Sequence, residues 1–125
     1  MSDRPRSYDR EYETTVARRV RKRLGYDRSG RSITRFVVQL EYVIDDEWQP
    51  VVRYDHDAIG EFGHDVSDEG IHVDVFRDGE KYRTEFIAPP LPATRALDLA
   101  EDHFATHLEA FIRRFESCQE IERQG

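Results

Sequence analysis

The side chains of this sequence that could do chemistry are concentrated between residues 53 and 74. Residues 53–57 read Arg-Tyr-Asp-His-Asp, and they are followed by His64-Asp65 and by His72-Val73-Asp74. A histidine flanked by carboxylates can exchange a proton near neutral pH, and an arginine beside it can stabilise charge that develops on a phosphate. We therefore interpret this stretch as a candidate acid–base site for a phosphate-containing substrate.

Four residues of the stretch are the candidate catalytic groups. Arg53 is the predicted phosphate clamp, and Asp55 is the carboxylate predicted to orient a histidine. The acid or base is either His64 or His72, and the sequence leaves these two open. Whether the four side chains can meet depends on the elements that carry them.

Two hairpins are expected to carry these residues. Apolar residues alternate with others from Phe36 to Ile44, which is typical of a half-buried strand, and a second strand is predicted from Trp48 to Asp55. A three-residue loop, 45–47, is favoured because it matches apolar partners across the hairpin. The expected pairs are Ile44 with Trp48, Leu40 with Val52, and Val38 with Tyr54.

The second hairpin is signalled by Asp78-Gly79, a strong type I′ turn pair between strands 71–77 and 80–87. A regular register sets Ile71, Val73 and Val75 against Phe86, Thr84 and Tyr82 on one face. The same register sets His72 against Glu85 and Asp74 against Arg83 on the other. The irregular stretch 56–70 connects the two hairpins.

This register predicts one polar sheet face, with His64 in the adjoining loop. The face would carry Arg53, Asp55, His72, Asp74, Arg83 and Glu85. Asp74, Arg83 and Glu85 are assigned as binding residues that surround the catalytic groups. An alternative interpretation is that the same residues form ordinary cross-strand ion pairs on a solvated surface.

Metal binding is the less favoured interpretation of the histidines. Neutral imidazoles and carboxylates bind divalent ions, but the spacing of His56, His64 and His72 matches no compact ligand motif. His103 and His107 lie four residues apart on a predicted helix without the glutamate of a metallopeptidase motif, so we interpret them as histidines at the edge of the core. The sequence predicts no metal and no cofactor.

A helix is predicted near the N-terminus. Tyr8, Tyr12, Val16, Val20 and Leu24 recur every four residues, and Gly25 would end the helix. Residues 27–32 would then form a linker. The last two turns of this helix would carry the basic residues Arg18, Arg19, Arg21, Lys22 and Arg23.

This basic run is part of a marked division of charge. Residues 1–35 hold 11 Arg or Lys against 5 Asp or Glu, whereas residues 36–125 hold 8 against 21. The run could contact nucleic acid phosphates, although such contacts weaken steeply with salt. Docking on an acidic surface, in the same chain or in a protein partner such as a second copy, is favoured over nucleic acid.

A second helix is predicted from about Ala93 to Cys118, after Pro89, Pro90 and Pro92 end the sheet. The expected fold class is α+β, with an N-terminal helix, a four-stranded antiparallel sheet of two hairpins, and a C-terminal helix packed on the apolar sheet face. Residues 8–118 would form one domain. Residues 1–7 would be disordered and residues 119–125 frayed.

Composition indicates the environment. The chain has 17 Arg, 2 Lys, no Asn and 26 acidic residues, which is the style of a salt-loving archaeon, because carboxylates hold hydration when salt screens their repulsion. One cysteine, Cys118, excludes an internal disulfide. No apolar run is long enough for a membrane span or an export signal, so a cytoplasmic protein without membrane contact is expected.

The residues carry a resemblance. Residues 48–55, Trp-Gln-Pro-Val-Val-Arg-Tyr-Asp, followed by His72-x-Asp74 and the Asp78-Gly79 turn, resemble a family of small uncharacterised prokaryotic and haloarchaeal proteins. More weakly, the Arg-Tyr-Asp followed by histidines is similar to the TumE-like toxin components of toxin–antitoxin pairs. The segment between Asp55 and His72 is longer here, which leaves His56 and His64 as alternative equivalents of the family histidine.

Two hypotheses of function follow. The resemblance to toxin components implies a toxin-like, RNA-directed protein in which Arg53, Asp55 and either His64 or His72 act. The alternative is a non-catalytic interaction module, either a homo-oligomer or a protein that docks on an acidic partner through its basic first helix.

Overall fold

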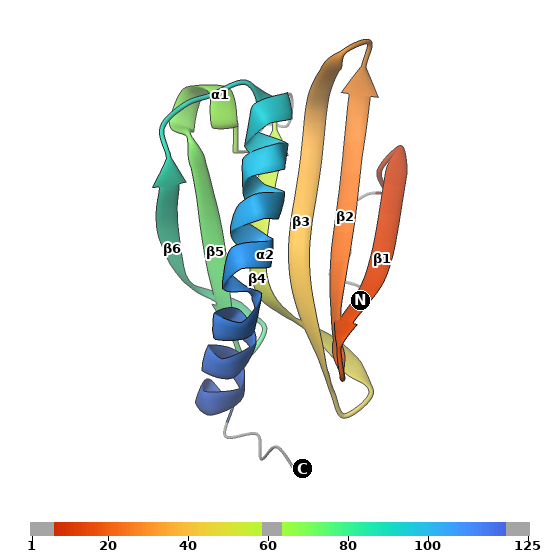
Figure 1. Ribbon diagram of the computed structural model, residues 1–125, viewed down its shortest axis with the longest axis vertical. Coiled ribbons are helices and arrows are strands. Elements are labelled where there is room, and N and C mark those ends of the chain that lie inside the picture. Colours follow the sequence, from red (N-terminus) through yellow and green to blue (C-terminus); the bar gives the residue numbers. More distant parts are fainter. Residues whose placement is uncertain (1–6, 59–63, 120–125) are drawn as a thin grey trace.

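A computed structural model describes residues 7–58 and 64–119. These residues form one six-stranded antiparallel sheet with a long helix packed on one of its faces (Figure 1). The strands pair in chain order, β1 to β6. Their bounds are β1 Arg10–Ala17, β2 Val20–Ser29, β3 Ser32–Ile44, β4 Glu47–Asp57, β5 Ile71–Arg77 and β6 Glu80–Ala88. The helices are the one-turn α1, Val66–Glu69, and the long α2, Ala93–Cys118.

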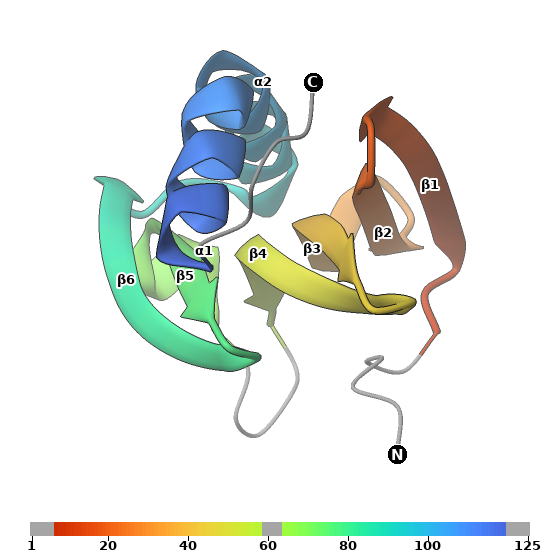
Figure 2. The same ribbon diagram turned by 90° about the horizontal axis from the view of Figure 1, so that it is seen from below.

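The core lies between α2 and one face of the sheet. The sheet curves around α2, so that this face is concave and the opposite face is convex (Figure 2). Fully buried side chains from the middle strands meet the apolar stripe of the helix, where each Å² removed from water contributes about 25 cal/mol. They include Phe36, Leu40, Val52, Tyr54, Ile71 and Val73 from the sheet, and Ala96, Ala100, Phe104, Phe111, Ile112 and Phe115 from α2.

The predicted C-terminal helix is confirmed, with the bounds and the packing face expected. The predicted N-terminal helix is wrong, because residues 8–24 form the hairpin of β1 and β2 instead. A four-residue spacing of apolar residues fits a strand as well as a helix, since all the members share the parity of one sheet face. The hairpin turn, Arg18-Arg19, uses a left-handed arginine (φ 66° at Arg19) where a glycine or asparagine would have signalled it.

Two further predictions, that Gly25 ends a helix and that residues 27–32 form a linker, are wrong because these residues also belong to the sheet and its turns. Gly25 lies inside β2, and a side chain there would collide with Tyr8, whose Cδ1 is 2.8 Å from the position of an added Cβ. Residues 27–32 close a second hairpin, with Gly30 in the left-handed region (φ 61°). The observed fold is therefore a six-stranded sheet with one long helix, and not the predicted four-stranded sheet between two helices.

The hairpin of β3 and β4 is confirmed, but its turn differs from the prediction. Val38 pairs with Tyr54 and Leu40 with Val52, as expected. Ile44 pairs with Glu47 rather than with Trp48, because the turn has two residues, Asp45 and Asp46, both left-handed. A β-bulge at Val51 absorbs the extra residue and restores the predicted pairs further along.

The turn of the last hairpin is confirmed, with Asp78 and Gly79 both at positive φ (54° and 80°). Its predicted register is wrong beyond the first two pairs. Phe76 pairs with Lys81, but Val75 pairs with Arg83, so Tyr82 is a bulged residue of β6. Residues Arg83 to Phe86 therefore face the side opposite to the one predicted, and a second bulge at Ile87 shifts the register again before Ala88, which pairs with Ile71.

Several predictions of chain organisation lie outside the described residues. Apart from Ser7 and Gln119, the predicted disordered N-terminus and frayed C-terminus are not described, nor are residues 59–63 of the connection between the hairpins. The described helices include none that is long and apolar enough to cross a membrane.

The convex face is organised around the carboxylate of Glu41, which is almost fully buried (5% exposed). One carboxylate oxygen accepts a hydrogen bond from Arg21 Nε at 2.7 Å. The other accepts from Gln39 Nε2 at 2.6 Å and from Arg23 Nη1 at 3.3 Å. Charge-assisted hydrogen bonds of this kind tie β2 to β3 where no helix covers the sheet.

The network reaches both neighbouring strands. On one side, Arg23 also lies 3.6 Å from Glu11 and 3.9 Å from Glu13 of β1. On the other side, the oxygen of the Gln39 amide accepts a hydrogen bond from Arg53 of β4. A continuous chain of polar contacts therefore crosses four strands and ends at the candidate site.

Replacing Glu41 by alanine should lower the free energy of unfolding by about 3 to 5 kcal/mol, because it leaves Arg23 buried without its main carboxylate partner. Urea unfolding of the purified protein would measure the change. Glu47→Ala, at an exposed position of β4, is the matched control and should change stability by less than about 0.5 kcal/mol. Equal losses for the two variants would contradict a supporting role for the Glu41 network.

Candidate functional site

The convex face brings together five of the predicted site residues. Arg53 of β4 lies directly opposite Asp74 of β5 in the antiparallel register. Asp55 and His72 lie two residues further along the same strands. His64 precedes α1, and its ring lies edge-on to that of His72 with the ring centroids 4.8 Å apart.

The two histidines are linked through their ring nitrogens. Nε2 of His64 lies 3.1 Å from Nδ1 of His72 and 2.8 Å from the carbonyl oxygen of Gly70. Nδ1 of His64 lies 3.4 Å from a carboxylate oxygen of Glu69. This order of carboxylate, imidazole and imidazole fixes the ring of His72 and leaves its Nε2 as the atom that can exchange a proton.

Two carboxylates stand next to this pair in different environments. Burial raises the pKa of the Asp55 carboxyl, and the charge of Asp74 raises it further, while Arg53 and His64 oppose the shift. Asp74 is held by Thr84 Oγ1 at 2.7 Å and by Lys81 Nζ at 3.5 Å. Asp55 can therefore keep a proton at a higher pH than an ordinary aspartate.

Arg53 is held in place from two directions. Its Nε donates to Gln39, and its guanidinium lies over the ring of Phe76, 4.7 Å from the ring centroid. Because Gln39 accepts through the amide oxygen and donates to Glu41 through the nitrogen, it passes the order of the buried network to Arg53. Neither Gln39 nor Glu41 stood out in the sequence as a site residue, since both read only as alternating strand positions.

Arg83 and Glu85 are not part of this face, contrary to the prediction. The bulge at Tyr82 turns both onto the concave side, where Glu85 contacts Arg83 and lies 3.6 Å from Arg114 of α2. On the convex face, His72 and Asp74 therefore have other cross-strand partners than the predicted Glu85 and Arg83. His72 lies opposite Phe86, and Asp74 lies opposite Thr84.

The predicted basic docking residues are largely engaged within the chain. Arg21 and Arg23 belong to the Glu41 network, and Lys22 binds Glu101 of α2 at 2.8 Å on the concave side. Arg18 and Arg19 form the exposed turn between β1 and β2. No basic helix is available to dock on a partner, because these residues belong to strands and a turn.

The other histidines serve the core or its edge. His56 is buried, its Nδ1 accepts the backbone N–H of Val66 at 3.1 Å, and burial lowers its pKa. Nδ1 of His103 lies 2.6 Å from the hydroxyl oxygen of Tyr54, and His107 stacks on the His103 ring at 4.0 Å. Within residues 7–58 and 64–119, no group of three or more metal-binding side chains comes together.

Besides Gln39 and Glu41, sequence analysis missed Glu69 and Phe86 as residues of the site. Glu69 belongs to α1, whose start is capped by Asp65 accepting from the backbone N–H of Ser67 at 2.9 Å. The order Asp-x-Ser-x-Glu could have signalled such a turn. Phe86 could not have been placed beside His72 without knowledge of the bulge.

The comparisons with known proteins identify a family. The model of a domain of unknown function, DUF7718, matches residues 6–121, which is nearly the whole chain. No curated protein and no solved structure shows a significant match. The chain therefore belongs to the DUF7718 family, whose function is unknown.

Proposed function

We propose that the convex face is an acid–base site that cleaves single-stranded RNA, with His72, Asp55 and Arg53 as its reacting groups. The observation that carries the proposal is the 3.1 Å contact between His64 and His72, which orients one imidazole beside a carboxyl of raised pKa. A base and an acid with different proton affinities are what cleavage of a phosphodiester by the ribose hydroxyl requires.

The proposed reaction uses each group once. The carboxylate of Asp55, whose raised pKa makes it a stronger base than an ordinary aspartate, removes the proton from a ribose 2′-hydroxyl, and the 2′ oxygen forms a bond to phosphorus. The Gly70 carbonyl can only accept, so Nε2 of His64 carries a hydrogen, Nδ1 of His72 accepts it, and Nε2 of His72 carries the hydrogen of its own ring. The bond to the 5′ oxygen breaks, and that oxygen leaves with the hydrogen of His72 Nε2, giving a 2′,3′-cyclic phosphate, while the hydrogen of His64 Nε2 moves to His72 Nδ1 and His64 keeps the hydrogen on its Nδ1 beside Glu69. The guanidinium of Arg53 stabilises the negative charge on the phosphate oxygens in the transition state.

The shape of the site favours a polymer as substrate. Arg53, Asp55, His72 and Asp74 alternate along β4 and β5 with the core residues Val52, Tyr54, Val73 and Val75. Their side chains therefore face away from α2, which lies on the concave side of the sheet (Figure 2). Phe86 is 63% exposed, and its ring lies edge-on to His72 with the centroids 5.5 Å apart. An exposed aromatic ring beside the proposed catalytic histidine is a platform on which an unpaired base can stack.

The acidic composition bears on the conditions of such an activity. Its interpretation as an adaptation to a salt-rich cytoplasm remains a prediction. Under that salt, contacts to phosphates weaken, so base stacking on Phe86 would have to supply much of the affinity. The proposal therefore requires an RNA with unpaired bases rather than a duplex.

His72→Ala should reduce cleavage of a single-stranded RNA by about 10²- to 10⁴-fold, the usual loss when a general acid is removed. The purified protein and an end-labelled RNA would give the rate, and growth of a host that expresses each variant would report toxicity. The wild type should arrest growth, and His72→Ala should relieve the arrest.

His107→Ala is the matched control, because His107 is an exposed histidine on α2 and this variant should leave the rate unchanged.

Phe86→Ala should weaken RNA binding by about 1 to 3 kcal/mol. A wild-type protein that neither cleaves RNA nor affects growth would refute the proposed activity.

A second candidate function is a homodimer formed through the exposed edge of β6. This edge strand carries two large exposed aromatic side chains, Tyr82 at 52% and Phe86 at 63% exposure. An edge strand has backbone groups that can pair with a second copy of the same edge. Such a dimer would be a non-catalytic interaction module that no longer depends on a basic helix.

The Phe86→Glu variant should convert this dimer to a monomer, since it replaces an exposed aromatic side chain of the proposed interface by a charge. Light scattering coupled to gel filtration would give the mass. Tyr12→Glu, at an exposed aromatic of the opposite edge strand, is the control and should remain dimeric. A wild type that is monomeric at tens of micromolar would exclude this candidate.

A further inference from the structure

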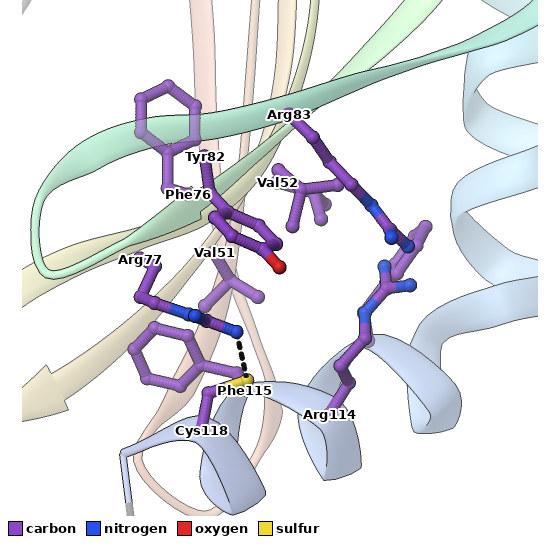
Figure 3. Close-up of a pocket in the computed structure, with 11 residues that line it drawn as sticks. Val51, Val52, Phe76, Arg77, Tyr82, Arg83, Arg114, Phe115 and Cys118 are labelled. Carbon is purple, nitrogen blue, oxygen red and sulfur yellow. Dashed lines mark hydrogen bonds between the residues drawn. The ribbon is translucent and has the colours of Figure 1, made fainter.

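A cavity lies on the other side of the sheet, between the C-terminal half of α2 and the turn end of β5 and β6 (Figure 3). Its volume is about 100 Å³. The inner wall is apolar and includes Val51, Val52 and Phe115, while three arginines, Arg77, Arg83 and Arg114, stand around it. Phe76, on which the Arg53 guanidinium lies, also lines the cavity, but none of the reacting groups of the proposed RNA site does.

The charge around the cavity has one sign. All the charged side chains that line it are arginines, in a chain of formal net charge −7. Arg83 and Arg114 share a single carboxylate, that of Glu85, with Arg114 at 3.6 Å. Three guanidinium groups with one carboxylate between them leave an excess of positive charge that favours an anion.

Arg77 supplies a second indication of a ligand. Its Nη2 lies 3.1 Å from Sγ of Cys118, and its guanidinium lies over the ring of Tyr82 at 4.0 Å. Its Nε is buried and has no hydrogen-bond partner among the described residues. A buried donor without an acceptor costs free energy, and an oxygen atom of a ligand would remove that cost.

The walls restrict the chemistry of the anion. Guanidinium groups bind carboxylates through paired hydrogen bonds, whereas the apolar wall offers no partner for further charged oxygens. A volume of about 100 Å³ is less than that of a cavity of about 150 Å³ known to hold benzene, so only a few carbon atoms fit. The combination suits a small carboxylic acid better than phosphate.

We propose that this cavity binds a short-chain aliphatic carboxylate. The carboxylate lies among Arg77, Arg83 and Arg114, with one oxygen accepting from Nε of Arg77. The alkyl chain lies against Val51, Val52 and Phe115. The site is independent of the proposed RNA cleavage, so either can fail without the other.

The test is a titration of the full-length protein with butyrate, followed by NMR. Saturable shifts of residues around the cavity are expected, and Arg77→Gln and Arg114→Gln should each weaken binding by about ten-fold or more, the usual effect of a lost hydrogen bond to a charged group. Arg113→Gln, one residue away on the exposed side of α2, is the matched control and should bind as the wild type does.

Cys118 gives an independent measurement, because its thiol is exposed and lies at the cavity. Saturating butyrate should slow its reaction with a disulfide reagent, whereas butylammonium should not. Absence of saturable butyrate binding, equal binding of butylammonium, or inorganic phosphate binding as tightly as butyrate would each overturn the proposal. Unchanged affinity in both arginine variants, with circular dichroism showing that they are folded, would also overturn it.

Discussion

The buried carboxylate of Glu41 is the interaction on which the open side of this molecule depends. A sheet with one helix can bury only one of its faces in apolar contacts, and the other face must be completed by polar side chains. Here Arg21, Arg23 and Gln39 surround Glu41 so closely that Arg23, Gln39 and Glu41 are each at most 5% exposed. Polar groups can be buried in this way only because each finds a partner, and the loss of the Glu41 carboxylate would take from Arg21 and Arg23 the nearest carboxylate that each contacts.

The same network explains why a reactive cluster can be held in order on an uncovered sheet. Gln39 connects Glu41 to Arg53, and Arg53 lies opposite Asp74. From the other side, the one-turn helix α1 supplies Glu69 and Gly70, which position His64 against His72. The candidate site thus lies where an ordered polar network and a capped helical turn meet. Its side chains are oriented by neighbours rather than by a surrounding pocket, which is the reason to expect a polymeric substrate.

Much of the fold from Phe36 onwards could be predicted, because the apolar residues of each segment there follow either the two-residue period of a strand or the spacing of a helix, and not both. Asp78-Gly79 is typical of a hairpin turn, and the apolar stripe of residues 93–118 is typical of a helix. The first hairpin could not be predicted, since Tyr12, Val16 and Val20 suit a strand as well as a helix and the turn at Arg18-Arg19 lacks a typical turn residue. The bulge at Tyr82 was equally hidden. A bulge shifts the pairing of β6 by one residue and so changes which of its side chains face α2. The sequence of β6 gives no sign of this shift, because its pattern of residues fits either register. That single residue separates Arg83 and Glu85 from the group of predicted site residues that did come together.

The two β-bulges next to the cavity argue that these irregularities serve a purpose. Val51 is the extra residue of β4, Tyr82 is the extra residue of β6, and both line the cavity beside α2. A regular β6 would turn Arg83 towards the convex face, where it would oppose Asp74, and would leave Glu85 unable to reach Arg114. With the bulge, Arg83 faces the helix and Tyr82 stacks on Arg77, so that three arginines surround one space. Bulges are found where a strand must redirect a side chain. In this protein one bulge moves Arg83 and Glu85 from the convex face, the proposed RNA site, to the concave face, where Arg83 lines the proposed carboxylate site and Glu85 contacts Arg114. The separation of the two proposed sites is therefore a consequence of backbone geometry.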